Sequence, residues 1–391
     1  NEYYKEKLIQ TVNFINKYFK NKENLLGSAY DADSEGVEGK YYVWTQSEIR
    51  EILSKKDADI FCQYYDITDG GNWEGNSIPH IILEMKSLCN LLKINRQELE
   101  SSLEKSRLIM KKHRKSRIAP GTDDKIIVSW NGLMISSLAK VSSVLDNPRF
   151  FSIASRAVSF IIEKMSKKDG SLYRTHRNGI SHIDAFAEDY AFFGNSLIDM
   201  YESSFDPSYL KEARRFADIL IDNFYDNGIF KQSLSKNIVI NIKNGMDNAT
   251  PSFIFMSCLF LSRLSYYYDL QKYRDIVKET LENFGHSIND YPYAHSTALL
   301  VHNFISEGPI EIAIAGDKPD GKLVKIFRNY LLPYKIMALS DKDLDIPLLS
   351  QKMKIDDKET SYICHNYTCD SPITNSKELD NVLSTIFKKS Y

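Results

Sequence analysis

The amino-acid sequence predicts a mainly α-helical protein built from helical hairpins, with a small α/β segment at its C-terminal end. Apolar residues recur at helical spacing through most of 131–285, and short turns marked by Asp or Pro alternate with long loops. The turn sequence around Gly170 recurs around Gly228, 58 residues later. A period of about sixty residues matches one long hairpin and a connecting loop.

Each predicted helix follows from this pattern. A chain of 391 residues can bury a large core, and apolar periodicity places helices in it. The C-terminal part alternates like a strand at 309–316, continues as a helix to Tyr330, and returns as strands at 334–339 and 362–364. We therefore expect a helical domain over 1–306 and a small α/β domain over 307–391. The predicted helices are 3–20, 133–145, 148–165, 185–203, 207–224, 251–268, 271–285 and 376–388.

Composition excludes several classes of protein. The 50 Lys and Arg residues balance 52 Asp and Glu residues to a net charge of −2, so no basic excess indicates nucleic acid. No apolar run reaches the length of a membrane span, and we expect no signal peptide. We expect a cytoplasmic protein with no membrane partner.

The five cysteines are odd in number and irregularly spaced, which argues against a disulfide framework. Cys364 and Cys369 form the closest pair, but a C-x4-C pair without a second pair is a weak zinc signal. We predict no structural disulfide, no metal and no cofactor.

The long loops should share one edge of the molecule. In a row of hairpins, every short turn lies on one side and every long loop on the other. We call the side with the long loops the rim, and we expect a ligand site there. The long loops are 25–45, 120–130, 169–185, 226–251 and 287–295.

The densest functional sequence runs from Leu26 to Trp44. Asp31, Asp33 and Glu35 lie between glycines and before an aromatic run, which makes them candidates for acid/base catalysis. A solvated acidic turn is the alternative, and a full set of calcium ligands is missing. Trp44 is a candidate for stacking on a sugar, as is Trp73 in the glycine-framed loop 71–76. Tyr, Phe and Trp together make up 12% of the chain. Such a high aromatic content is common in carbohydrate-binding clefts, although aromatic residues also fill helical cores.

Polar residues also open the inner helices. The predicted catalytic candidates here are Asp124, Glu188 and Asp189. Helix capping is the alternative role for such residues, above all for Asp247, and a buried structural role is the alternative for His295. The predicted substrate-binding residues are Asp123, Trp130, Asn131, Tyr190, Asp247 and His295.

Several of these segments resemble the spermatogenesis-associated protein 20-like family, whose members carry a thioredoxin-like domain. The resemblance implies an α/α toroid of six-hairpin, glycosidase-like type. A helix at the first residues suggests a toroid incomplete at its N-terminus. We expect either that the chain is a fragment of a longer protein, or that the thioredoxin-like segment is a separate partner chain that completes the ring. The sequence departs from the family at Phe253–Phe255, where the family usually reads Gly-Asn-Ser. The matching segments are 28–44, 71–75, 123–134, 188–191, 201–206 and 362–372.

The preferred function is a carbohydrate-active enzyme or sugar-binding protein that uses rim carboxylates for acid/base chemistry on a sugar-like ligand. The alternative is a non-catalytic scaffold that presents clients to a thioredoxin-like redox domain. We also expect six residues that are far apart in the sequence to converge on one cavity: Asp31, Asp33, Asp124, Trp130, Glu188 and Asp189.

Overall fold

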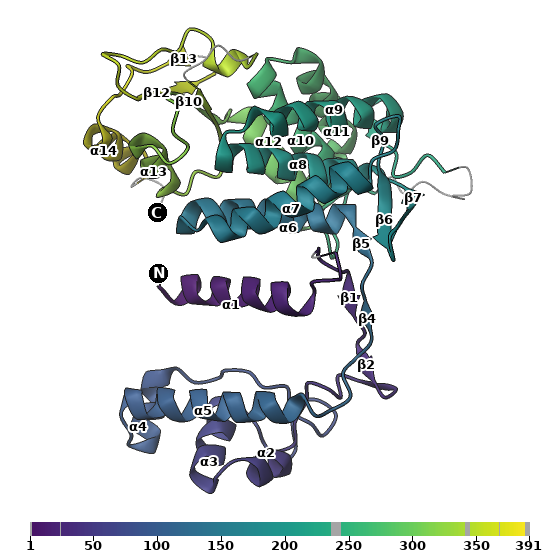
Figure 1. Ribbon diagram of the computed structural model, residues 1–391, viewed down its shortest axis with the longest axis vertical. Helices are drawn as coiled ribbons and strands as arrows, with labels where there is room; N and C mark the ends of the chain where they lie inside the picture. The colour runs from purple at the N-terminus through teal and green to yellow at the C-terminus, as the bar shows by residue number, and fades with distance from the viewer. Residues whose placement is uncertain (1, 24, 236–243, 341–344, 367, 388–391) are drawn as a thin grey trace. The chain divides into compact units, whose positions relative to one another are not determined.

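The computed structural model describes residues 2–23, 25–235, 244–340, 345–366 and 368–387 (Figure 1). The chain forms two compact units. Unit 1 comprises residues 1–28 and 125–391, and unit 2 comprises residues 29–124. The domain boundary predicted at 306/307 falls inside unit 1, and the sequence pattern did not separate residues 29–124.

Unit 1 consists of helical hairpins in two layers, as the sequence pattern predicts. Each hairpin pairs an inner helix with an outer one, and the inner helices contact their neighbours in the order α6, α8, α10 and α12. The described residues thus contain three complete hairpins and the inner helix of a fourth, which confirms the mainly α, toroid-type arrangement. The hairpins are α6 (Val128–Leu145) with α7 (Pro148–Lys164), α8 (Ala187–Ser204) with α9 (Pro207–Phe224), and α10 (Phe253–Tyr268) with α11 (Gln271–Asp290), followed by α12 (Ser296–Ser306).

Small residues allow the inner helices to approach closely. A Cβ atom on Gly132 of α6 would lie 2.7 Å from the backbone nitrogen of Phe193 in α8. One on Gly194 would lie 2.2 Å from the ring of Phe260 in α10. The outer helices instead bury a single stripe, because each packs on one side only. The main hydrophobic core of unit 1 therefore follows the inner row.

The first helix, α1 (Glu2–Tyr18), joins the same core through one side. Val12 is buried, and Leu8 and Ile9 pack against the core. The rings of Tyr4 and Phe14 remain exposed.

The C-terminal segment is the predicted α/β element. Its sheet has the strand order β11-β10-β12-β13, with β10 parallel to β11 and antiparallel to β12. The central strand β10 is buried along most of its length, and β11 contacts the inner helices α8 and α10. The elements are β10 (Ile310–Ala315), α13 (Lys322–Arg328), β11 (Lys335–Ser340), β12 (Thr360–His365), β13 (Thr368–Cys369) and α14 (Ser376–Phe387).

Unit 2 is a small helical body with two hydrophobic clusters of its own. Its helix α5 packs against α2, α3 and α4, and its ends meet where β1 (Ala29–Tyr30) pairs with β4 (Thr122–Asp123). The helices are α2 (Gln46–Ile52), α3 (Lys55–Tyr64), α4 (Met85–Leu92) and α5 (Arg96–Arg114).

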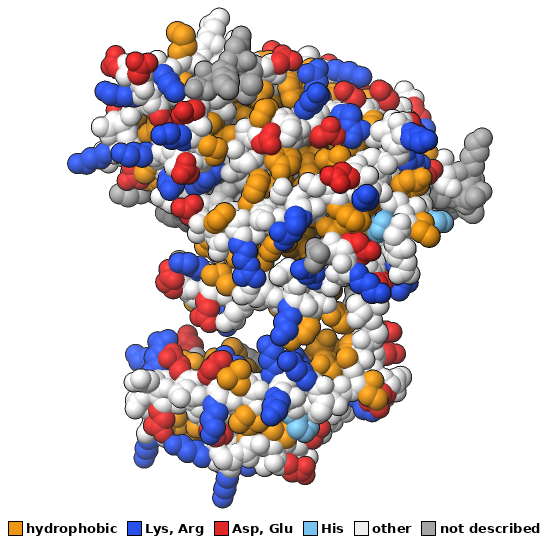
Figure 2. Space-filling model, viewed as in Figure 1, with side chains coloured by type: hydrophobic (Ala, Val, Ile, Leu, Met, Phe, Trp, Pro, Cys, Tyr) orange, Lys and Arg blue, Asp and Glu red, His pale blue; other side chains and the backbone are white. Residues whose placement is uncertain are grey.

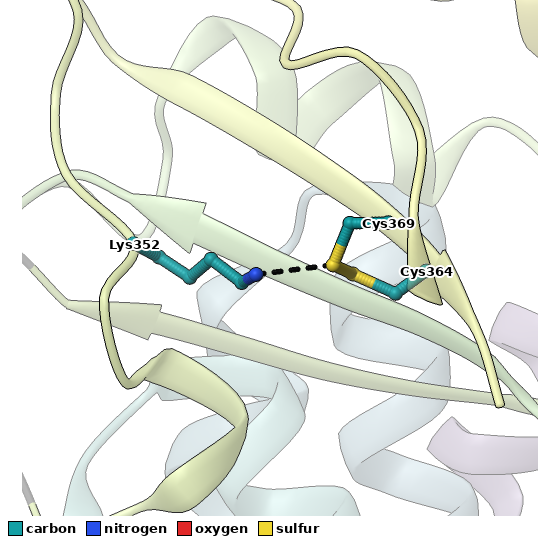
Figure 3. The surroundings of a disulfide bond; sticks show 3 residues. All are labelled: Lys352, Cys364 and Cys369. Carbon is teal, nitrogen blue, oxygen red and sulfur yellow. Dashed lines mark hydrogen bonds between the residues drawn. A yellow bond between two sulfur atoms is a disulfide. The ribbon is translucent and has the colours of Figure 1, made fainter. Parts of the chain in front are cut away.

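One sequence prediction is wrong. Cys364 and Cys369 form a disulfide, because they are directly opposite each other in the β12–β13 hairpin (Figure 3). Spacing along the chain did not reveal the pairing, since the hairpin turn between them was not predicted. Lys352 Nζ donates a hydrogen bond of 3.0 Å to the Cys369 sulfur. Cys62, Cys89 and Cys258 are free thiols.

The surface shows no separation of charge on the face drawn in Figure 2, where acidic, basic and apolar side chains are interspersed. Among the helices of the described ranges, none has the length and apolar character needed to cross a membrane.

Candidate functional site

The acidic segment of unit 2 folds as a tight β-hairpin. Strands β2 (Asp33–Ser34) and β3 (Val37–Glu38) pair in antiparallel fashion, so Asp33 lies opposite Glu38. Glu35 and Gly36 form the two-residue turn with φ angles of 56° and 74°. Such a turn requires positive φ at both positions, and the glycine supplies one of them without steric cost. The segment therefore presents its carboxylates from a defined turn.

A second glycine-framed turn supplies an aromatic ring. Backbone hydrogen bonds between Trp73 and Asn76 close the turn, and Gly71 is required because a Cβ there would lie 2.2 Å from the Asn76 carbonyl oxygen. The half-buried Trp73 ring lies against Gly39, where a Cβ would be 2.9 Å from the ring. This contact fixes the aromatic ring beside the end of the acidic hairpin.

These two turns and the chain that follows α5 enclose a hollow of about 560 Å³, within the range of small-molecule sites. Three exposed glutamates surround it: Glu35, Glu38 and Glu74. Trp73 and Tyr41 contribute aromatic surface. Lys40 Nζ lies 3.0 Å from the Glu35 carboxylate, so one of the three carboxylates has a cationic partner. We call this site the unit 2 hollow.

Arg117 holds one wall of the unit 2 hollow in place. One of its guanidinium nitrogens donates to the carbonyl oxygens of Lys40, Tyr41 and Val43, and the other lies 3.0 Å from the Glu48 carboxylate. Its guanidinium carbon lies 3.8 Å from the centre of the Trp44 ring. Arg117 thus acts as a positioning residue for the chain that leads away from the acidic hairpin.

The unit 2 hollow contains some of the predicted residues and not others. Glu35 and Trp73 line it. Trp44 is only 5% exposed in the unit 2 core beneath Arg117, and so does not present its face to the hollow. The acidic residues predicted beside them in sequence do not line the hollow: Asp31, Asp33, Asp123 and Asp124.

In unit 1, the predicted acidic pair at the start of α8 meets an arginine that the sequence analysis did not identify. Arg174, on strand β6 (Tyr173–Arg177), lies 2.6 Å from Glu188 and 2.9 Å from Asp189. Strand β6 pairs with β7 (Ile180–Asp184) within the long loop 169–185. The loop therefore carries a hairpin that brings a cation to the helix start.

Asp189 is completely buried, and its oxygens are occupied. One accepts the backbone N–H of Ser129, and the other accepts that of Phe186 together with Arg174. Burial raises the pKa of Asp189 to about 6, against the opposing effect of Arg174. Because Asp189 ties the first turn of α6 to that of α8, its position favours a structural role over direct contact with a ligand.

Asp247 plays the same part for the next pair of inner helices. Its carboxylate accepts the N–H of Ser252 before α10, and both the N–H and hydroxyl of Thr297 in α12. His295 is fully buried, with ring nitrogens 2.9 Å from the Ser287 hydroxyl and 3.2 Å from the Gly245 carbonyl. Both residues therefore stabilise the helix starts.

Three other predicted residues lie in the first turns of α6 and α8. Tyr190 is buried, and its hydroxyl accepts the N–H of Leu172. Asn131 donates to the carbonyl oxygens of Leu26 and Ile127. Trp130 is 42% exposed. Of the predicted residues in unit 1, Trp130 is exposed, and Glu188 and Asp247 are partly exposed. The convergence of both units' residues on one cavity stays a prediction.

The residues of the unit 2 hollow that sequence reasoning missed include Arg117, Glu38 and Glu74. Glu38 and Glu74 were inside motifs already singled out, whereas Arg117 follows a basic run with no distinguishing spacing. Across the described ranges, no group of three or more His, Cys, Asp or Glu side chains is arranged to hold a metal ion.

The chain is similar in sequence to human spermatogenesis-associated protein 20. The two are 26% identical over an alignment of 434 residues in length, which covers 98% of this chain and 55% of the relative. The rat protein of the same name is 28% identical over 408 residues, covering 91% and 51%. The chain spans about half the length of the curated relatives it matches. No family model matches the sequence.

Among solved structures, the cellobiose 2-epimerase from Bacillus thermoamylovorans matches with a TM-score of 0.35 and 11% identity, covering 73% of this chain and 72% of that one. A glycoside hydrolase of family 105 from C. acetobutylicum matches with a TM-score of 0.35 and 13% identity, covering 53% and 61%. Likeness at this level transfers no chemistry to the present chain. Over nearly its whole length, the chain is thus similar in sequence to proteins named spermatogenesis-associated protein 20.

Proposed function

We propose that this protein binds a sugar-like ligand in the unit 2 hollow. The observation that carries the proposal is the Trp73 ring held by Gly39 beside three glutamates, in a hollow of about 560 Å³. The apolar face of a pyranose stacks on an indole ring, while its hydroxyl groups donate hydrogen bonds to carboxylates. An aromatic platform with acceptors at its edge therefore suits a polyhydroxylated ligand.

Binding is better supported than hydrolysis of a glycosidic bond. A glycosidase needs two carboxyl groups facing the same bond, one of them able to donate a proton. In unit 1, Asp189 is enclosed by its three donors. In unit 2, Glu35 is paired with Lys40. We therefore assign Glu35, Glu38 and Glu74 to hydroxyl recognition.

The test is saccharide binding by the whole chain, measured by isothermal titration calorimetry with glucose and cellobiose as first probes and a glycan array for breadth. We expect Trp73→Ala to weaken binding by about tenfold or more, because it removes the stacking surface. The matched control is Trp130→Ala, which removes an exposed tryptophan from unit 1 and should leave the affinity unchanged.

Intrinsic fluorescence gives a second readout, because Trp73 is one of three tryptophans. Ligand-induced quenching should persist in Trp130→Phe and disappear in Trp73→Phe. The proposal is wrong if no saccharide on the array binds saturably, or if Trp73→Ala binds as tightly as the native protein.

A further inference from the structure

A second hollow, of about 420 Å³, lies in unit 1. It is formed near the C-terminal ends of α6 and α8, with α10, α12 and the strand-containing C-terminal segment completing its walls. It is thus separate from the helix starts where Asp189 and Asp247 lie, and separate from the unit 2 hollow. We call it the unit 1 hollow.

Its floor is a buried network of paired charges. Arg263 is 8% exposed and lies 2.7 Å from Asp199 and 3.8 Å from Glu202. Glu202 also accepts a hydrogen bond of 2.8 Å from the Tyr267 hydroxyl and is paired with Lys335. Because both carboxylates already have cationic partners, the floor offers no unsatisfied negative charge.

The wall carries a cation of a different kind. Arg328, at the end of α13, donates to the carbonyl oxygen of Ser203 at 2.7 Å. Its Nε atom is buried without a hydrogen-bond partner, and no carboxylate of the described residues forms an ion pair with it. Burial lowers the pKa of Arg328, although Asp146, Asp320 and Glu202 act in the opposite direction. A partly buried guanidinium without a carboxylate partner favours an incoming anion.

The charge balance of the side chains that line the hollow also favours an anion. Four cationic side chains line the unit 1 hollow, against two carboxylates, which leaves an excess of two positive charges. The cations are Lys140, Arg263, Arg328 and Lys335, and the carboxylates are Asp199 and Glu202.

The opening of the hollow is apolar. Val144, Leu300 and Leu331 line it and are 67%, 48% and 70% exposed. Inside, Leu259 and Phe304 extend this surface. Each side chain at the opening would lose contact with water if an apolar body lay across it, which is favourable by about 25 cal/mol per Å² of buried surface.

We propose that the unit 1 hollow binds a small amphipathic anion, with a carboxylate or phosphate head at Arg328 and an apolar body along Leu300 and Leu331. The guanidinium accounts for the negative head, and the exposed leucines account for the apolar body. The paired floor excludes a cationic head, since it has no carboxylate to offer. This site is independent of sugar binding in unit 2.

The test uses the full chain and isothermal titration calorimetry with decanoate below its micellar concentration. We expect saturable binding at one site, with decanol and acetate each weaker by about tenfold or more, because each lacks one of the two interactions. Decyl phosphate separates the two possible heads: tighter binding than decanoate indicates phosphate esters, and weaker binding indicates carboxylates. Both results support an amphipathic anion, whereas equal affinity for decanol and decanoate overturns it.

Variants locate the site. Arg328→Gln should weaken decanoate binding by about tenfold. The control is Lys325→Gln, on the same helix but outside the hollow, which should change nothing. Leu331→Glu places a negative charge at an exposed position and should weaken decanoate binding without affecting folding. If circular dichroism shows that Arg328→Gln is unfolded, Leu331→Glu tests the site in its place. Unchanged affinity in a folded Arg328→Gln or in Leu331→Glu would refute the proposal.

Discussion

Helix α8 carries two buried aspartates with opposite electrostatic environments. Asp189, in its first turn, has one cationic partner, Arg174, which it shares with Glu188. Asp199, three turns later, has two cationic partners, Arg263 and Lys140, and accepts a hydrogen bond from Ser136. Burial acts on both carboxyl groups to raise the pKa. It prevails at Asp189, whose pKa is about 6, and is overcome at Asp199, whose pKa is about 2.

The difference teaches that depth of burial alone does not decide the state of a buried carboxyl group. The number of cations and donors around it decides. At the start of α8, the carboxylate of Asp189 accepts backbone N–H groups and so joins two helices. Near its end, a fully compensated ion pair forms the floor of a hollow. The first site is therefore close to titration at neutral pH, and the second is not.

The largest effect is expected from removing the compensated charge. Asp199→Asn leaves Arg263 buried with only the more distant Glu202 as a partner, and should lower the free energy of unfolding by about 3–5 kcal/mol. The measurement is urea unfolding at pH 7. The control is Asp269→Asn, which breaks the 2.7 Å pair with Arg274 at a side chain that is 59% exposed, and should cost less than about 1 kcal/mol. Equal effects of the two substitutions would contradict the comparison.

A smaller effect, with a pH signature, is expected at Asp189. Its folded pKa of about 6 lies above the ordinary 3.8, so the folded protein binds the extra proton between these values. The free energy of unfolding should fall by about 2–3 kcal/mol from this group as pH rises from 4 to 6, and then remain constant. Asp199 contributes the reverse: its stabilisation is present above pH 4 and is lost as pH falls through about 2.

The check is the difference between the native protein and Asp189→Asn in urea unfolding from pH 4 to pH 7.5. The variant should lack this part of the slope, while the contributions of all other groups cancel. A difference that is flat with pH, or that grows in the native protein's favour as pH rises, would show that Asp189 is not the titrating group.

Sequence periodicity predicted the hairpins of unit 1 because their helices are long and each outer helix has one apolar stripe. The C-terminal strands could be predicted equally well, since the sequence of β10 alternates like a strand and is bounded by Pro309 and Gly316. Helices α2 to α4 are short and pack in a separate body, so their pattern was too brief to predict.

The site was harder to predict from the sequence than the fold. Asp189 and Asp247 were found as polar residues at helix starts, but their roles depend on N–H groups from a neighbouring helix. Arg174 and Arg117 meet their partners only through tertiary structure, and neither has a sequence signature. Glu35 and Trp73 were found because glycines frame the turns that carry them. Turn chemistry was thus the informative local signal, and charge pairing across elements was not.

The smallest effect tests whether Lys140 contributes to the low pKa of Asp199. Its Nζ lies 3.2 Å from the carboxylate, but the lysine side chain is 64% exposed, so water and salt weaken the attraction. Lys140→Gln should lower the free energy of unfolding at pH 7 by less than about 1 kcal/mol, and this loss should vanish in about 1 M NaCl. It should also raise the pH at which acid unfolding begins, because Asp199 keeps only Arg263 as a close cation. Lys211→Gln, an exposed lysine on α9 outside this network, is the control. A salt-independent loss, or an acid transition identical to that of the control, would assign the low pKa of Asp199 to Arg263 and Ser136 alone.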